Sequence, residues 1–517
     1  MKKELSLILS PYESSSEELY KPAVARALEI SEDEISFIRI IRKSIDARGR
    51  NIKMDLTFQV FIGEEPSSPV ENTFNYQNVS SKPEVVVVGT GPAGLFASLR
   101  LIELGFKPVI LERGKQAHER KQDIDMLESN HILDENSNYC FGEGGAGTFS
   151  DGKLYTRSKK RGDINRILEI FYLHGADESV LYEAHPHIGS DVLPTVIANM
   201  RKTILNAGGI LNFNTRVTDI GVSGDKITHV LTDKNEKVTG KAYILATGHS
   251  ARDVYYLFQS RGIQIESKAF AMGVRVEHPQ ELIDNIQYHC RKDKYLPPAS
   301  YSQVEQVNGR GVYSFCMCPG GQIVPSATAN YEIVVNGMSL SKRNSPFANS
   351  GIVVQVNPED FRSYQNMQGL AGVHLQELLE QKAYKQTHKG QSAPAQRLTD
   401  FVSGRPSQNL PVCSYLPGTI ASPMHEWLPD FMKRNLQEGF RMFDRKMKGF
   451  LTRDAVIVGV ESRTSSPVRI PRDPDNGNHV KIKNLFTAGE GAGYAGGIVS
   501  SAVDGENMAV MCGRSLV

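Results

Sequence analysis

The stretch Val85–Gly94 constrains the fold of this chain more than any other. Four valines, typical of a buried strand, run into Gly89, Gly91 and Gly94 and then into a helix-like apolar pattern. In such a turn the first glycine permits the tight bend, the second lets the backbone approach a phosphate, and the third lets the helix pack on the strand. The helix N-terminus would face the anion. The pattern predicts the pyrophosphate site of a Rossmann unit.

An acidic residue stands where a dinucleotide site needs one. The predicted strand Lys107–Leu111 ends at Glu112, which lies 23 residues beyond Gly89. A carboxylate at this offset binds a ribose diol and repels a 2′-phosphate. The same glycine spacing recurs from Gly142 and from Gly491. No convincing strand precedes the former, and no complete βαβ unit can follow the latter, so both predict glycine-rich loops of another kind.

Composition excludes several classes of protein. The 517 residues carry a formal net charge of +1, which gives no overall bias towards nucleic acid or membrane. Six cysteines are too few for a disulfide scaffold. Cys316 and Cys318 are predicted to be packed side chains, and no other Cys/His cluster has zinc-ligand spacing, so no metal is expected. Because neither a signal peptide nor a membrane span is visible, we expect a cytoplasmic protein without membrane contact.

The first 62 residues predict a small separate module. Its strand, helix and two further strands, in the order β-α-β-β, suggest a ferredoxin-like α+β fold. A solvated strand face explains its basic stretch best, whereas an RNA-binding or partner-binding face is the alternative. The basic residues are Arg39, Arg42, Lys43, Arg48, Arg50 and Lys53.

Four ordered segments resemble the FAD-binding fold shared by fumarate-reductase-like, geranylgeranyl-reductase-like and glutathione-reductase-like flavoproteins. The first, residues 85–114, reads VVVVGTGPAGLFASLRLIELGFKPVILERG. The second is Asn212–Val217, a strand whose backbone contacts adenine in that family. The third, residues 244–250, reads ILATGHS, and the fourth, residues 485–505, reads LFTAGEGAGYAGGIVSSAVDG. The loop Cys140–Arg157 and the N-terminal module also resemble a bacterial family of uncharacterised FAD-dependent dehydrogenases.

The resemblance implies one noncovalent FAD and the residues that hold it. Glu490 would accept hydroxyl protons of the ribityl chain, and the helix from Ile498 would face the flavin N1–C2=O edge. The alternatives are a flexible lid for residues 142–152 and a surface turn for residues 491–497. The implied cofactor-binding residues are Gly89, Gly91, Pro92, Ala93, Gly94, Glu112, Arg113, Gly145, Gly147, Thr148, Val217, Ala246, Thr247, Gly248, Gly489, Glu490, Gly497, Ile498 and Val499.

We therefore expect an α/β chain: a Rossmann-like FAD/NAD(P)-binding domain with an inserted α+β substrate domain and the N-terminal module. The expected boundaries are 1–62 for the module, 63–82 for a linker, 83–266 for the first part of the FAD domain, 267–450 for the substrate or cap domain, and 451–517 for the closing part of the FAD domain.

The predicted function is that of an FAD-dependent oxidoreductase passing a hydride between flavin and an unidentified small molecule. An FAD- and RNA-binding protein and an NAD-dependent dehydrogenase are the alternatives, and nucleic acid is the less favoured partner. Arg463 and Arg469 are candidates for holding an anionic substrate, with a structural ion pair as the alternative. His249 is a third candidate, with a helix cap as its alternative. No residue is assigned to catalysis. NAD(P)H could act only as a transient reductant, because no second Rossmann motif occurs between Gly248 and Phe450.

Overall fold

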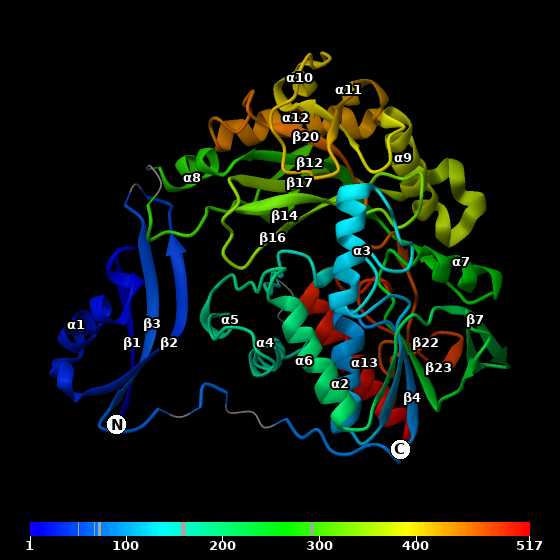
Figure 1. The fold of residues 1–517 in the computed structure, drawn as a ribbon, viewed down its shortest axis with the longest axis horizontal. Helices are drawn as coiled ribbons and strands as arrows, with labels where there is room; N and C mark the ends of the chain where they lie inside the picture. Colours follow the sequence, from blue (N-terminus) through cyan, green and yellow to red (C-terminus); the bar gives the residue numbers. More distant parts are fainter. Residues whose placement is uncertain (50, 67, 71–73, 157–161, 290–292) are drawn as a thin grey trace.

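The valine-rich strand lies at the centre of a six-stranded sheet in the order β22-β23-β10-β4-β5-β6. The computed structural model describes residues 1–517 except 50, 67, 71–73, 157–161 and 290–292 (Figure 1). Val88 pairs in parallel with Leu111 and Leu245, so the carboxyl ends of these strands meet at one edge. The strands are β4 (Glu84–Val88), β5 (Lys107–Leu111), β6 (Ile210–Asn212), β10 (Ala242–Leu245), β22 (Asn478–His479) and β23 (Ile482–Thr487).

Helices cover one face of this sheet, and a small sheet covers the other. The helical core joins β4 with α2 (Pro92–Glu103) and α13 (Ile498–Leu516), whose apolar residues are buried together. The same domain contains α3 (Ala117–Asn130), α4 (Ile164–Leu173), α5 (Ser179–Tyr182), α6 (Leu193–Asn206) and α7 (Arg252–Ser260). The covering strands are β7 (Val217–Ser223), β8 (Lys226–Thr232) and β9 (Lys237–Val238). We call these parts together the Rossmann domain.

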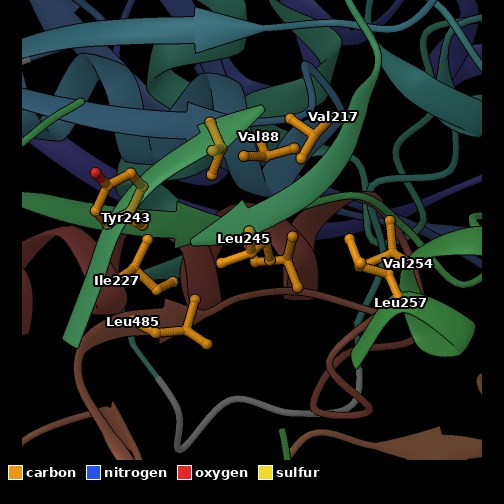
Figure 2. A pocket seen from close by; sticks show the side chains of 10 residues that line it. Val88, Val217, Ile227, Tyr243, Leu245, Val254, Leu257 and Leu485 are labelled. Atoms are coloured by element: carbon orange, nitrogen blue, oxygen red, sulfur yellow. The ribbon is translucent and has the colours of Figure 1, made fainter. Parts of the chain in front are cut away.

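An apolar pocket lies between the central sheet and the small sheet that covers it. Figure 2 shows an apolar pocket where β7 and β8 meet the other face, with Val217 and Val88 near one another and Leu485 on the far wall. All its lining side chains are apolar except for the hydroxyl of Tyr243. That hydroxyl already accepts from the N–H of Gly240 at 3.2 Å, so the pocket suits packing of one sheet on another better than ligand binding.

A second, seven-stranded sheet forms the upper part of Figure 1, in the order β13-β14-β17-β12-β20-β18-β19. Its strands are β12 (Phe270–Pro279), β13 (Val304–Val307), β14 (Arg310–Cys318), β17 (Phe347–Val356), β18 (Ala393–Arg397), β19 (Thr419–Ala421) and β20 (Val456–Glu461). The hairpin β15 (Gly321–Pro325) and β16 (Val335–Ser339) lies beside it. Its helices are α8 (Gln280–Tyr288), η4 (Pro358–Leu370), α9 (Ala371–Thr387), α10 (Leu398–Ser403), α11 (Met424–Trp427) and α12 (Asp430–Lys446). We call this part the cap domain.

One strand lies in a different domain from the one expected. β20 pairs with β12 and β18 in the cap sheet, whereas the sequence analysis placed residues 451–517 in the closing part of the FAD domain. The sequence of a fully buried strand does not show which sheet the strand joins, because the central strands of both sheets are covered on both faces and are equally apolar. The chain returns to the Rossmann domain after β20, through a short ribbon of β11 (Glu266–Ser267) with β21 (Val468–Arg469).

The N-terminal module contains β1 (Lys2–Leu9), α1 (Glu17–Leu28), β2 (Ile35–Asp46) and β3 (Lys53–Ile62), with short 3₁₀ turns at Glu13–Ser15 and Glu32–Glu34. The order β1-β3-β2, with β3 antiparallel to both neighbours, is that of the first half of a ferredoxin-like fold. No second helix or fourth strand follows in the described residues before β4. The sequence also predicts a turn at Arg48–Arg50 between β2 and β3, and residue 50 lies outside the described residues.

Two basic residues on β2 of the N-terminal module face acidic residues of the Rossmann domain. Lys43 lies 3.4 Å from Glu183, and Arg39 lies 4.0 Å from Glu178, both next to α5. The backbone N–H of Ala184 donates to the carbonyl of Lys43. These contacts dock the edge strand β2 onto the Rossmann domain. No helix among the described residues combines the length and apolar character that a membrane crossing requires.

The close packing of α13 on α2 can be tested with a single methyl group. A Cβ added at Gly505 would lie 2.1 Å from the carbonyl oxygen of Ala93, which is backbone and cannot swing away. We expect Gly505→Ala to lower the free energy of unfolding by about 2–3 kcal/mol, measured by urea denaturation. Gly513→Ala on the same helix is the matched control, because its Cβ would meet side chains and not backbone, Phe106 at 3.2 Å and Leu104 at 3.3 Å. Equal stability of the two variants would contradict the close approach.

Candidate functional site

The first glycine turn folds as its motif predicts. Gly89 has φ +103°, and a Cβ there would lie 2.5 Å from the carbonyl oxygen of Ala246. A Cβ at Gly94 would lie 2.0 Å from the carbonyl oxygen of Gly89, so the helix follows the strand without space for a side chain. α2 begins after Gly91, with Pro92 in its first turn. The nearest atom to a Cβ at Gly91 is 4.0 Å away, which leaves that face of the turn open for a ligand.

The second glycine-rich loop packs directly against the first. A Cβ at Gly145 would lie 3.0 Å from the Cα of Gly91, and the N–H of Gly144 donates to the carbonyl of Thr90 at 3.0 Å. A Cβ at Gly147 would meet Ile498, the first residue of α13, at 3.2 Å. The loop therefore lies between the N-termini of α2 and α13. Its neighbour Thr148 is buried and donates its hydroxyl to the carbonyl of Glu143.

An arginine that the sequence analysis missed anchors this loop. The Arg120 guanidinium, on α3, is fully buried and donates to three backbone carbonyls, those of Asn138 (2.7 Å), Glu143 (2.8 Å) and Tyr139 (2.9 Å). Burial lowers the pKa of Arg120 to about 10, and nearby acids including Glu112 oppose that shift. Nothing in the spacing of α3 marks Arg120, because its partners are carbonyls that any residue can supply.

Glu112 ties the two loops together. Its carboxylate accepts from the N–H and hydroxyl of Thr90 (2.9 and 2.6 Å) and from the N–H groups of Gly114 (2.9 Å) and Gly142 (3.1 Å). A carboxylate offers about four acceptor positions. A ribose hydroxyl would therefore replace or share one of these bonds. Arg113, the next residue, lies 4.1 Å from the Phe141 ring centroid and 3.0 Å from Asp253.

The third and fourth motifs meet beside this pair of loops. A Cβ at Gly491 would lie 2.5 Å from the carbonyl oxygen of Gly248, and one at Gly489 would lie 2.8 Å from the Cβ of Ala93. Interior contacts of this kind disfavour a plain surface turn. At Gly248, Gly496 and Gly497, by contrast, a Cβ would meet nothing within 4 Å. The open glycines lie on the loop after β10 and at the start of α13.

Two further residues that sequence reasoning missed fix the fourth motif. Asp504 accepts from the N–H of Gly489 at 2.7 Å and pairs with Arg472 at 2.6 Å. The Arg472 guanidinium also lies 3.8 Å from the ring centroid of Tyr494, inside the motif. The bidentate pairing of Arg472 with Asp504 thus links the loop before α13 to the body of that helix.

The structure separates the three substrate candidates. Arg463 is buried and donates to Thr328 at 2.6 Å, Glu380 at 2.8 Å and Glu332 at 3.2 Å, which favours the structural ion pair. Arg469 is exposed on β21, 5.5 Å from the Tyr494 ring centroid. Nδ1 of His249 lies 3.5 Å from Oε1 of Glu490, inside the glycine cluster. His249 is therefore the candidate closest to the predicted cofactor residues.

The remaining predicted residues border the same cluster or support it. Val217 begins β7 and directs its side chain to the apolar pocket with Val88 (Figure 2), so its backbone is the part available to a ligand. Thr247 lies beside the first turn, with its Cα 3.3 Å from a Cβ at Gly89. Val499 is buried in the first turn of α13. The described residues hold no group of three or more His, Cys, Asp or Glu side chains that could bind a metal ion.

Three glycine segments, namely the first turn, the second glycine-rich loop and the fourth motif, thus form one cradle between the N-termini of α2 and α13, and Gly248 of the loop after β10 borders it. The faces of Gly91, Gly248, Gly496 and Gly497 are open where side chains would otherwise project. A helix N-terminus offers N–H groups and a positive dipole end to an anion. A long dinucleotide with a pyrophosphate and an electron-accepting ring suits such a cradle.

Comparisons with known proteins show the family to which the chain belongs. A family profile described as "FAD-dependent protein, C-terminal domain-like" matches residues 269–464, which cover the cap sheet through β20. A domain of unknown function matches residues 1–61. An uncharacterized protein of Clostridium beijerinckii is 38% identical over 507 residues, covering 94% of each chain. The chain belongs to this family of FAD-dependent proteins. FAD is its cofactor.

The solved structures that resemble this chain are much less similar to it in sequence than the Clostridium beijerinckii protein is. A geranylgeranyl bacteriochlorophyll reductase-like protein of Thermoplasma acidophilum is 11% identical with a TM-score of 0.35, over 84% of this chain and 78% of that one. An L-amino acid deaminase from Proteus vulgaris is 12% identical with a TM-score of 0.34, over 86% of this chain and 96% of that one. These TM-scores are too low to support a functional inference.

The role of Arg120 can be tested by removing its donors while keeping most of its volume. Arg120→Met leaves three buried carbonyls without their donor, and we expect a loss of about 2–4 kcal/mol in the free energy of unfolding together with weaker FAD retention. The neighbouring Lys121→Met is the control, because Lys121 is exposed and pairs only with Asp125 on the same helix. Unchanged FAD content and stability in Arg120→Met would show that the loop is held by other contacts.

Proposed function

We propose that this family member is an FAD-dependent oxidoreductase. In this proposal bound flavin passes a hydride between a small molecule and an electron partner, and the protein is cytoplasmic. The observation that supports it is the convergence of the three glycine segments between the N-termini of α2 and α13, with their open faces in one cradle. A cradle built for a dinucleotide beside a separate cap domain is the usual arrangement for a flavin enzyme acting on a small substrate.

The residues of the cradle divide by the part of the cofactor they would hold. The turn from Gly89 to Gly94 and the start of α2 would hold the pyrophosphate, and Glu112 the adenosine ribose. The backbone at Val217 would face the adenine. Gly489 and Glu490 would contact the ribityl chain, and the N–H groups of Ile498 and Val499 would face the edge of the ring where negative charge gathers on reduction. FAD supplies the hydride-transfer chemistry when bound.

The chain's own titratable groups would handle protons and substrate charge. His249, whose Nδ1 lies 3.5 Å from Oε1 of Glu490, would exchange a proton with the substrate, because an imidazole can both donate and accept one. Arg469 is the candidate arginine that stays outside the buried ion cluster, and it would hold an anionic group of the substrate. The cap domain would enclose the substrate above the cradle.

Two observations weigh against an RNA-binding module and against a second, nicotinamide-binding Rossmann domain. Arg39 and Lys43, which an RNA-binding face would use, lie next to Glu178 and Glu183 of the Rossmann domain. The cap sheet is built from antiparallel pairs apart from β18 with β19, whereas a nicotinamide-binding Rossmann unit is parallel. A dedicated second dinucleotide domain therefore forms no part of this proposal.

The first test concerns the cofactor and its place. Purified protein should contain one noncovalent FAD, released intact into the supernatant by acid precipitation. Gly91→Val should abolish binding, because a branched side chain would fill the open face of the turn. Gly49→Val is the control, since a Cβ there meets nothing within 4 Å and lies in the N-terminal module. Normal flavin content in Gly91→Val would refute this placement.

The second test concerns the electron donor. Without a dedicated nicotinamide domain, NADH and NADPH would bind only in the substrate cleft, so we expect weak affinity, above roughly 0.1 mM. Anaerobic titration of the flavin absorbance with each nucleotide measures it. Saturable reduction at micromolar concentrations would reveal a dedicated nicotinamide site.

A further inference from the structure

Four buried charged side chains form a cluster that the proposed chemistry does not use. Its members are Arg252, Glu332, Glu380 and Arg463, each less than one-tenth exposed. Glu380 is bonded by both arginines, with Arg252 at 2.7 and 2.8 Å and Arg463 at 2.8 and 3.2 Å. Glu332 is held less tightly, 3.2 Å from Arg463 and 3.7 Å from Arg252.

The cluster joins the two domains. Arg252 is the first residue of α7 in the Rossmann domain, whereas Glu380 lies on α9 in the cap domain. Glu332 lies in the loop between β15 and β16, and Arg463 follows β20. One turn further along α7, the hydroxyl of Tyr256 donates to Glu377 of α9 at 2.9 Å. The two helices are therefore connected at two successive levels.

Each side of the cluster continues into a loop at the cradle. On one side, α7 directly follows the segment that contains Gly248 and His249, and His249 contacts Glu490 of the fourth motif. On the other side, the loop between β15 and β16 contacts the flank of the second glycine loop, where the thiol of Cys140 lies 3.4 Å from the hydroxyl of Ser326. Asn330 of the same loop donates to Glu135 at 3.1 Å.

We propose that this cluster is a clasp that closes the cap domain over the cradle, and that Arg252 is the positioning residue that sets the Gly248–His249 loop. The role assigned to that loop rests on the proposed function. The physical basis is that buried charges are tolerated only when paired, so Arg252 either stays on its cap-domain partners or parts from them with both sides exposed to water. Within the cluster Arg252 has no partner from its own domain, because its bidentate partner Glu380 lies in the cap domain.

Glu332 makes the clasp sensitive to pH. Burial, and then the neighbouring Glu380 carboxylate, raise the pKa of Glu332 to about 8. Burial acts on Glu380 as well, but Arg252 and Arg463 outweigh it and hold its pKa below the ordinary range. The groups that face Glu332 are Arg252 and Tyr256 from α7, Glu380 from α9, and Arg463.

The sign of this dependence follows from linkage. In an open clasp Glu332 would be hydrated, so its pKa would fall from the raised value of the closed clasp towards its ordinary value of 4.5. The closed state therefore prefers the protonated carboxyl. Protonation of Glu332 therefore favours the closed state fully at a pH below 4.5, the ordinary pKa of Glu332. This contribution to closure is lost as the pH rises towards 8. Glu332→Gln, which resembles the protonated form, removes the dependence.

Hydrogen–deuterium exchange on the full-length protein as purified tests the clasp without a substrate. We expect Arg252→Met to speed exchange on the order of tenfold in residues 246–251 and also in residues 326–334, while β4 stays protected. Arg252→Lys should restore part of the protection. Arg261→Met is the control, because Arg261, the residue directly after α7, pairs with Asp219 on the exposed surface. Faster exchange in neither segment, or only in residues 246–251, would overturn the proposal.

A second measurement keeps the proposal testable if Arg252→Met fails to fold. After correction for intrinsic rates, exchange in residues 326–334 of the wild type should rise between pH 5 and pH 8, and that of Glu332→Gln should stay flat. An equal rise in both proteins would exclude Glu332 as the titrating group. Where FAD is bound, its visible circular dichroism should change in Arg252→Met at unchanged FAD content. Colourless protein would refute the proposed function, and the exchange result would still decide on the clasp.

Discussion

The architecture depends on backbone approaching backbone at positions where no side chain fits. Gly94 lies against the carbonyl of Gly89, Gly505 against Ala93, and Gly491 against Gly248, each with a would-be Cβ within 2.5 Å of a carbonyl oxygen. These contacts bring α2, α13 and the loop after β10 to the same edge of the central sheet. The N-termini of α2 and α13 can converge because these glycines have no side chain that would keep the backbones apart. Their positive dipole ends make the cradle electropositive.

A cradle made of loops needs supports, and the structure supplies them from outside the motifs. Arg120 holds the second glycine loop through three carbonyls, and Asp504 with Arg472 holds the fourth motif through the N–H of Gly489. Because the loops themselves are rich in glycine, they would lose much conformational entropy on ordering. The buried supports offset that loss, so rigidity at the cradle comes from α3 and from the body of α13.

The sequence was sufficient for the elements whose signal is local. The strand and turn from Val85 to Gly94 and the start of α13 follow from short patterns, and the structure has them at these residues. The ribose-binding role of Glu112 stays a prediction. The domain of β20 could not be predicted, because a buried strand reads the same in either sheet. The setting of Arg463 could not be predicted either, since its partners Glu332 and Glu380 are more than 80 residues away.

The two buried arginine sites solve the same problem in different ways. Arg120 carries a buried charge without a direct carboxylate partner and relies on carbonyl dipoles, and its pKa is lowered accordingly. Arg463 faces two carboxylates, and although burial opposes the charged form, Glu380 raises its pKa. Carbonyls of one loop fix that loop in place and cannot titrate. Carboxylates from different elements join domains and can take up protons. The first arrangement suits a permanent part of a cofactor site, whereas the second suits a contact that must open for a ligand to enter.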